Sequence, residues 1–254
     1  MTISQNEIEF YKKYGLVKLN IKLSKKKIDL FKQDIKKLKK LKKFAKSPNS
    51  NINFYFEKSV NNKSQLFRIE NFYNERLNIS KFINSGFFEK ILKCFSKKKF
   101  VLLKEKINLK PSGSLEDTLH QDFQTGWLDF GKELTTFIIS IDKSDKNNSS
   151  IIFDISGNNS KKKIGKLFKK LKKIDLKKPK FENYDLESGE IVMFNGFVPH
   201  MSKKNLSNKS RNQIYLTFCI PKFKNIREEY YENKVKNYPP NFKRKKNIRY
   251  SYRI

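Results

Sequence analysis

Apolar residues in the first hundred positions recur every three or four residues in two places, which is the spacing of a helix with one buried face. Ser24 precedes the first of these segments, whose apolar positions are Ile28, Phe31, Ile35, Leu38 and Leu41. Asn84 precedes the second, whose apolar positions are Phe87, Phe88, Ile91, Leu92 and Phe95. Ser4 and Glu7 have the spacing of a capping box, and Gly15 can end the short helix that they begin. The amino-terminal part is therefore expected to supply helices that pack against a sheet.

Shorter apolar or alternating runs predict the strands of that sheet. In chain order they are residues 16–19, 54–56, 66–69, 100–108, 134–141, 150–153 and 189–194. The fourth run alternates, so Lys104, Lys106 and Asn108 are expected on one face of a strand. The fifth predicts a buried central strand, with the sixth as its neighbour. This series of strands after a helical first part predicts a mainly β protein with flanking helices, a double-stranded β-helix of the jelly-roll or cupin-like barrel type.

The two histidines of the chain each lie in a short motif that suits metal binding. His120 and Asp122 are two residues apart, so in a strand their side chains would project from the same face. His200, on a second strand, would complete a site of two imidazoles and one carboxylate with open positions. This ligand set is typical of non-haem Fe(II) oxygenases. A hydrogen-bonded pair of His120 and Asp122 without a metal is the alternative.

Arg211 follows His200 by eleven residues and precedes the apolar run at 214–218. A hairpin between the two segments would return the guanidinium to the neighbourhood of the metal. There it can bind a carboxylate through two parallel hydrogen bonds. An Fe(II) oxygenase that uses 2-oxoglutarate needs such an anchor for the distal carboxylate, so this cosubstrate is expected together with the iron.

The combination of these motifs resembles the phytanoyl-CoA dioxygenase family of 2-oxoglutarate and Fe(II) enzymes. The matching residues are His120-Gln121-Asp122, the strand at 189–194, His200-Met201-Ser202, Asn205 and Arg211. The resemblance implies that His120, Asp122 and His200 bind Fe(II), with O2 as a further cosubstrate. It also implies that Arg211 and Ser202 bind the distal carboxylate of 2-oxoglutarate. It covers roughly residues 100 to 254, and more weakly the first hundred.

Two loop segments depart from the family pattern. Where family members have an Asn-Gly-x-Leu turn and then a Pro-Gly-Ser-His run, this chain has Asn147-Asn148-Ser149-Ser150 and Ile155-Ser156-Gly157-Asn158. Neither segment belongs to the implied metal site, so the departures concern loop geometry and substrate identity. In halogenating relatives a small residue replaces the carboxylate ligand. Asp122 therefore implies hydroxylation of an unactivated C–H bond, with release of succinate and CO2.

Four further residues are candidates for ligand contacts. The resemblance makes Lys106, on a strand expected to flank the site, a candidate for binding 2-oxoglutarate; a solvent-facing strand lysine is the simpler interpretation. Gln124, Thr125 and Trp127 closely follow the metal motif, where residues tend to lie at the mouth of a pocket. They are therefore expected to contact the substrate, and core packing is the alternative for Trp127.

Lysine and arginine number 57 against 25 acidic residues, which gives a formal net charge of +32. Such a charge suggests nucleic acid or an anionic membrane as a partner. The excess is spread over the whole chain and accompanies frequent Asn, Ile and Phe, so an AT-rich genome is the favoured explanation.

A positive field still favours an anionic small substrate, such as a phosphonate, a carboxylate or an acyl thioester. The tail at 230–234 and 238–240 also resembles bacterial family members that act on small metabolites. A nucleic-acid-binding protein, or an oxygenase that acts on nucleic acid, is the alternative function.

The two cysteines, Cys94 and Cys219, are too few for a disulfide framework and favour a reducing compartment. The amino terminus lacks the charged and apolar regions of a signal peptide, and no apolar run reaches membrane-spanning length, so a cytoplasmic protein is expected.

One domain is expected over residues 1–254, with supporting helices and strands at 1–99, the metal-binding jelly roll at 100–220 and a tail at 221–254. The lysine-rich segment 161–173 has helical spacing and is interpreted as a lid helix, a site for an anionic partner or surface padding.

Overall fold

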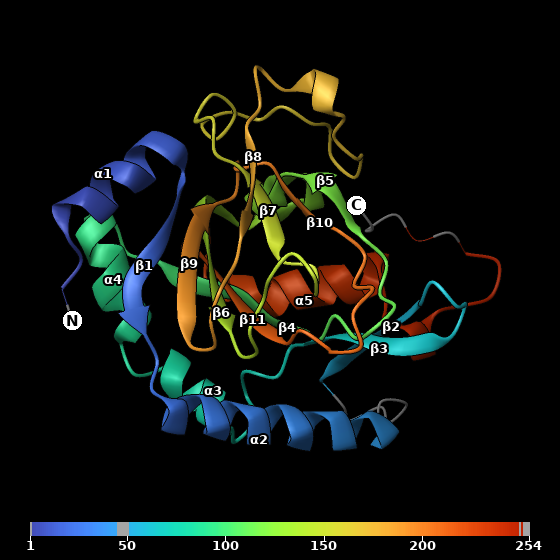
Figure 1. The fold of residues 1–254 in the computed structure, drawn as a ribbon. Coiled ribbons are helices and arrows are strands. Elements are labelled where there is room, and N and C mark those ends of the chain that lie inside the picture. Colours follow the sequence, from blue (N-terminus) through green and yellow to red (C-terminus); the bar gives the residue numbers. More distant parts are fainter. Residues whose placement is uncertain (1, 45–50, 249, 251–254) are drawn as a thin grey trace.

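Two antiparallel sheets form the centre of the computed structural model, which describes residues 2–44, 51–248 and 250 (Figure 1). The larger sheet has the strand order β1-β9-β6-β11-β4-β3-β2. Its strands are β1 (Leu16–Lys22), β2 (Asn53–Lys58), β3 (Ser64–Glu70), β4 (Val101–Asn108), β6 (Gly131–Ser140), β9 (Glu190–Asn195) and β11 (Gln213–Pro221). The smaller sheet has the order β5-β10-β7-β8. Its strands are β5 (Asp117–His120), β7 (Ile151–Asp154), β8 (Phe181–Tyr184) and β10 (His200–Ser202).

Helices cover the larger sheet, as Figure 1 shows most clearly for α2 at the bottom of the view. The α-helices are α1 (Gln5–Tyr14), α2 (Lys25–Leu41), α3 (Asn78–Ile83), α4 (Phe87–Phe95) and α5 (Ile226–Asn237). Short 3-10 helices are η1 (Lys42–Phe44), η2 (Asp122–Thr125), η3 (Trp127–Asp129), η4 (Lys173–Asp175) and η5 (Asn241–Lys243). The predicted capping box of Ser4 and Glu7 is present, and Gly15 ends α1 with a φ of 77°. Among the described residues, no helix combines the length and the apolar character needed to span a membrane.

The larger sheet separates two hydrophobic cores. Along β6, Phe137 and Ile139 pack in the core that includes Phe31 of α2 and Phe88 of α4. Ile138, between them, packs in the other core with Phe153 of the smaller sheet. Successive side chains of a strand point to opposite faces, so one strand serves both cores. Burying each such side chain contributes roughly 1.5–3 kcal/mol to the stability of the fold. This packing holds in place the strands that carry the site.

Two predictions about residues 150–173 were wrong. The strand β7 does not pair with β6; it lies between β10 and β8 in the smaller sheet. The segment 161–173 is not an α-helix, although its apolar residues have helical spacing. Phe168 has a φ of 57°, which breaks a helix, and the carbonyl oxygens of Lys162 and Lys166 accept hydrogen bonds from glutamine side chains. Contacts with the rest of the protein therefore override the local pattern here.

Candidate metal centre and active-site cavity

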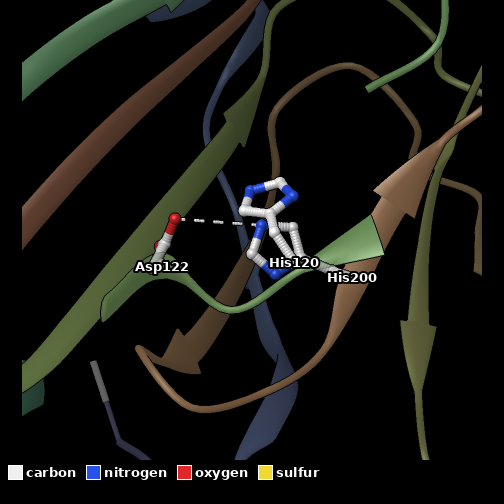
Figure 2. Close-up of side chains that lie close together, drawn as sticks. All are labelled: His120, Asp122 and His200. Atoms are coloured by element: carbon white, nitrogen blue, oxygen red, sulfur yellow. Dashed lines mark ion pairs between the residues drawn. The ribbon is translucent and has the colours of Figure 1, made fainter. Parts of the chain in front are cut away.

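Two strands and a turn bring three potential metal ligands together (Figure 2). His120 is the last residue of β5 and pairs in register with His200, the first residue of β10. Asp122 opens the turn η2, so the predicted strand running from His120 through Asp122 was wrong, because β5 ends at His120. One ligand atom from each residue lies within 4.8 Å of the others. Figure 2 shows the two imidazoles beside one another and the carboxylate facing His200, with 3.9 Å between its Oδ1 and Nε2 of His200.

Backbone carbonyls favour the same tautomer in both imidazoles. Nδ1 of His120 lies 2.6 Å from the carbonyl oxygen of Thr118, and Nδ1 of His200 lies 2.9 Å from that of Val198. A carbonyl oxygen can only accept, so each Nδ1 carries the proton and donates it. Each Nε2 then keeps its lone pair, which is the atom that a metal needs.

Two threonines orient the carboxylate of Asp122. The hydroxyl of Thr136 donates to Oδ2 of Asp122 at 3.1 Å. Thr217, opposite it on β11, lies 3.0 Å from the same hydroxyl and therefore donates to Thr136, whose only proton is already used. Oδ1 of Asp122 is left facing His200.

Burial keeps His200 neutral. Desolvation first, and repulsion by His120 second, lower the pKa of His200 to about 4, so the imidazole is uncharged at neutral pH as a metal ligand must be. Two imidazoles and one carboxylate beside an open cavity fit Fe(II) by ligand type and number.

The three potential ligands line a cavity of about 410 Å³, a volume suited to a small metabolite. Lys104, Lys106 and Asn108 of β4 line it together, so the face predicted from their alternation is correct. Lys106 is not a solvent-facing lysine: its Nζ lies 4.5 Å from the centre of the ring of Tyr215. Burial, followed by repulsion from nearby cations, lowers the pKa of Lys106 to about 8.

Ser202 lines the same cavity and belongs to a buried polar network. Nζ of Lys110 donates to Oγ of Ser202 at 2.8 Å and to Oδ2 of Asp117 at 2.9 Å. Oγ of Ser202 in turn donates to Oδ2 of Asp117 at 2.5 Å. Sequence reasoning missed Lys110 and Asp117, because nothing in the local pattern shows that they meet Ser202.

Arg211 is buried but is not among the residues that line the cavity. The predicted hairpin was wrong: β10 and β11 belong to different sheets, and the backbone N–H of Arg211 donates to the carbonyl of Lys110 at 3.2 Å. Nη1 of Arg211 donates to Oε1 of Gln213, which also accepts from the hydroxyl of Tyr215 at 3.0 Å. Arg211 thus reaches the cavity wall through Gln213 and Tyr215.

The three candidates for substrate contact have different positions. Thr125 and Trp127 line the cavity, and Trp127 packs at the same time in a core with Tyr230 of α5. Gln124 does not line it. Nε2 of Gln124 donates to the carbonyls of Lys166 and Lys169, so its side chain holds the lysine-rich segment instead.

Comparisons with known proteins find relatives that match most of the chain. A family model described as phytanoyl-CoA dioxygenase matches residues 11–213. A 2-aminoethylphosphonate dioxygenase from Uncultured bacterium HF130_AEPn_1 is 27% identical over 220 residues, which cover 84% of this chain and 81% of that protein.

Solved structures share the fold. The α-ketoglutarate-dependent carbocyclase SnoK from nogalamycin biosynthesis superimposes with a TM-score of 0.69 at 14% identity, over 85% of this chain and 84% of that one. EctD from S. alaskensis, solved with 2-oxoglutarate and 5-hydroxyectoine, gives a TM-score of 0.65 at 12% identity, over 85% of this chain and 76% of that one. The predicted jelly-roll architecture is confirmed.

The family match spans most of the chain and includes all three potential metal ligands. The predicted enzyme class and its cofactors are thereby confirmed. The chain belongs to the phytanoyl-CoA dioxygenase family and is a non-haem iron dioxygenase that depends on 2-oxoglutarate.

Proposed function

We propose that this dioxygenase hydroxylates an unactivated C–H bond of a small anionic metabolite. The observation that carries the proposal is the cavity, which has the three potential metal ligands on one part of its wall and several buried cations on another. The 27% identical relative is a 2-aminoethylphosphonate dioxygenase, so a phosphonate is the first substrate to test.

In this proposal Nε2 of His120, Nε2 of His200 and the carboxylate of Asp122 hold Fe(II). The iron, 2-oxoglutarate and O2 together supply the oxidation, in which 2-oxoglutarate becomes succinate and CO2 and one oxygen atom enters the substrate. The protein contributes the orientation of the ligands, the exclusion of water and the position of one C–H bond.

We assign the distal carboxylate of 2-oxoglutarate to Arg211 and Ser202, with Lys106 as a further contact. Nε of Arg211 is buried and has no hydrogen-bond partner among the described residues, and Arg211 lies behind Gln213 and Tyr215, so a carboxylate would meet this donor only beyond those two side chains. Lys106 lines the cavity, and its Nζ lies over the ring of Tyr215, a position from which the ammonium can meet an anion in the cavity. Thr125 and Trp127 are assigned to the substrate, whereas Gln124 is assigned to the support of the lysine-rich segment.

The test is anaerobic addition of Fe(II) and then 2-oxoglutarate to the purified protein, followed by visible absorption. We expect a metal-to-ligand charge-transfer band that requires both components and is absent in His200→Ala. In Arg211→Ala the band should need at least tenfold more 2-oxoglutarate, since a charge-assisted hydrogen bond is lost. Admission of O2 with 2-aminoethylphosphonate should then release succinate above the rate without substrate. A band of equal strength in His200→Ala would refute the assigned ligands, and an unchanged requirement in Arg211→Ala would refute the assigned anchor.

A further inference from the structure

Four cationic side chains are gathered on the cavity wall that β3, β4 and α5 form. Arg68, Lys104, Lys106 and Lys234 all line the cavity. Glu70 is fully buried and does not line it. Its Oε2 pairs with Nζ of Lys234, and its Oε1 lies 3.6 Å from Nζ of Lys104 and 3.5 Å from Nε of Arg68. One carboxylate is thus shared by three cations.

The cations outnumber the carboxylates that can neutralise them. Glu57 also lines the cavity and interacts with Arg68, but it is only partly buried. Four cations against Glu70 and Glu57 leave an excess of two positive charges. The fully buried Glu105 does not reduce this excess, because it pairs with Arg227 at 2.7 Å.

The other acidic residues of the cavity wall are also engaged elsewhere. Asp117 pairs with Lys110 at 2.9 Å, and Glu116 lies 4.0 Å from Lys204. Asp122 belongs to the metal centre. The excess charge on the wall of β3, β4 and α5 therefore has no further carboxylate partner among the described residues that line the cavity.

Hydrogen-bonding capacity is also left over in this cluster. Nε of Arg68 has no acceptor of good geometry among the described residues. Nζ of Lys104 lies over two aromatic rings, 4.6 Å from the ring centre of Trp127 and 5.5 Å from that of Tyr230. Burial is the largest influence that lowers the pKa of Lys104 and of Lys234, as expected for buried cations with too few anions. Buried charge without a partner is unfavourable, so an anionic ligand in the cavity would stabilise this arrangement.

We propose that Arg68, Lys104 and Lys234 form the subsite for a doubly charged tetrahedral oxyanion of the substrate, a phosphonate or a phosphate monoester. The inference rests on the proposed hydroxylase function and adds the group that is recognised and the residues that recognise it. A guanidinium fork and two ammonium groups provide directed donors for the oxygens of such a group, and its negative charge offsets the positive charge that Glu70 and Glu57 leave uncompensated. Lys234 lies on α5, beyond residues 11–213 of the family match, so this helix supplies a determinant of specificity.

Isothermal titration calorimetry with three small anions tests the subsite. The protein is loaded with Fe(II) and 2-oxoglutarate without oxygen, and the titration is repeated on the metal-free chain. At pH 8, ethyl phosphate carries two charges and ethylphosphonate is divided between its singly and doubly charged forms, whereas ethanesulfonate has the same tetrahedral shape and one charge. Both phosphorus compounds should bind at least about tenfold more tightly than the sulfonate, since each charge-assisted contact contributes strongly.

Variants that remove a positive charge and a variant that removes a negative charge separate ligand recognition from structural support. Lys104→Met and Lys234→Met each remove one positive charge and should weaken ethylphosphonate binding by about tenfold. Glu70→Gln removes the competing carboxylate and should strengthen it, an outcome that a purely structural cluster would not give. Lys143→Met is the matched control, because Lys143 is exposed and pairs with Glu187 outside the cavity; its affinity should equal that of the wild type.

Three results would overturn the subsite: equal affinity for phosphonate and sulfonate, weaker phosphonate binding in Glu70→Gln, or competition between ethylphosphonate and 2-oxoglutarate for the metal-free chain. The third would mean that the cluster binds the cosubstrate. Failure of the proposed function looks different. In that case the charge-transfer band is absent, while the metal-free chain still binds ethylphosphonate and responds to the variants.

Discussion

The hydroxyl of Thr136 determines which oxygen of Asp122 is available to a metal. It donates to Oδ2 and receives a hydrogen bond from Thr217, so Oδ1 remains directed at His200. The two imidazoles are oriented in a comparable way by backbone carbonyls. Partners that orient metal ligands in this way raise the affinity for the metal, because the ligands need not be ordered on binding.

Thr136→Val should therefore weaken Fe(II) binding by about 10- to 100-fold while leaving the fold intact. The measurement is anaerobic Fe(II) titration in competition with a chelating dye. Thr135→Val is the matched control, because Thr135 precedes it on β6 and its hydroxyl lies 3.4 Å from that of Tyr11 instead of meeting the metal site. Equal losses in the two variants would show that any threonine-to-valine change in β6 disturbs the site, and would refute the specific role of Thr136.

Site residues that lie in a short sequence motif could be predicted from the sequence. Site residues that come together only through the fold could not. His120, Asp122 and His200 were identified because two histidines and a nearby aspartate are an unusual ligand set. Arg68 and Lys234 were missed, because they come from β3 and α5 and meet only through Glu70. In a chain with 57 basic residues, no local pattern distinguishes these two.

At the scale of elements, the turn η2 joins the metal centre to the lysine-rich segment. Gln121 donates to the carbonyl of Lys162 at 2.9 Å and accepts from the N–H of Ile164 at 2.9 Å. Gln124 donates to the carbonyls of Lys166 and Lys169, and its own carbonyl accepts from Phe168. The turn that presents Asp122 thus also fixes the backbone of residues 162–169.

Gln124→Ala should loosen this segment, because two backbone carbonyls lose their donor and each unsatisfied group costs about 1–3 kcal/mol. Trypsin cleaves after lysine, so the rate of cleavage between residues 161 and 173 should rise by about tenfold. Mass spectrometry of a short digestion time course would locate the cuts. Gln5→Ala, which removes an exposed hydrogen bond to Glu9, should digest as the wild type does. An unchanged digestion pattern in Gln124→Ala would mean that the segment is held by other contacts.

The same segment shows why some elements could not be predicted. Helical spacing correctly indicated α2 and α4, whose apolar faces pack against the larger sheet. In segment 161–173 the spacing was misleading, because the side chains of Gln121 and Gln124 bind carbonyls that a helix would use internally. The partner of β7 was wrong for a related reason: an apolar strand suits either sheet, and long-range pairing decides between them.

At the scale of the molecule, the net charge of +32 sets the conditions under which the fold is stable. Basic residues outnumber acidic residues by 57 to 25, so most of them have no acidic residue to pair with. Several ion pairs, such as Lys25 with Asp29 and Lys93 with Glu89, join exposed side chains and contribute little to stability. Mutual repulsion of the lysines is therefore the larger long-range effect, and salt screens it.

The thermal midpoint of the metal-free protein should consequently rise when NaCl increases from about 20 to 300 mM, over which the screening length shortens to below roughly 10 Å. A gain of about 1–2 kcal/mol corresponds to a shift of roughly 2–8 °C for a chain of this size. Differential scanning calorimetry measures the shift, and KCl at equal ionic strength should give the same value, because screening depends on charge and not on the identity of the ion. A midpoint that falls with NaCl would show that attraction between opposite charges outweighs repulsion.

Sodium phosphate should raise the midpoint more than NaCl does at equal ionic strength, because phosphate would occupy the subsite at Arg68, Lys104 and Lys234. This additional rise should be smaller in Lys234→Met.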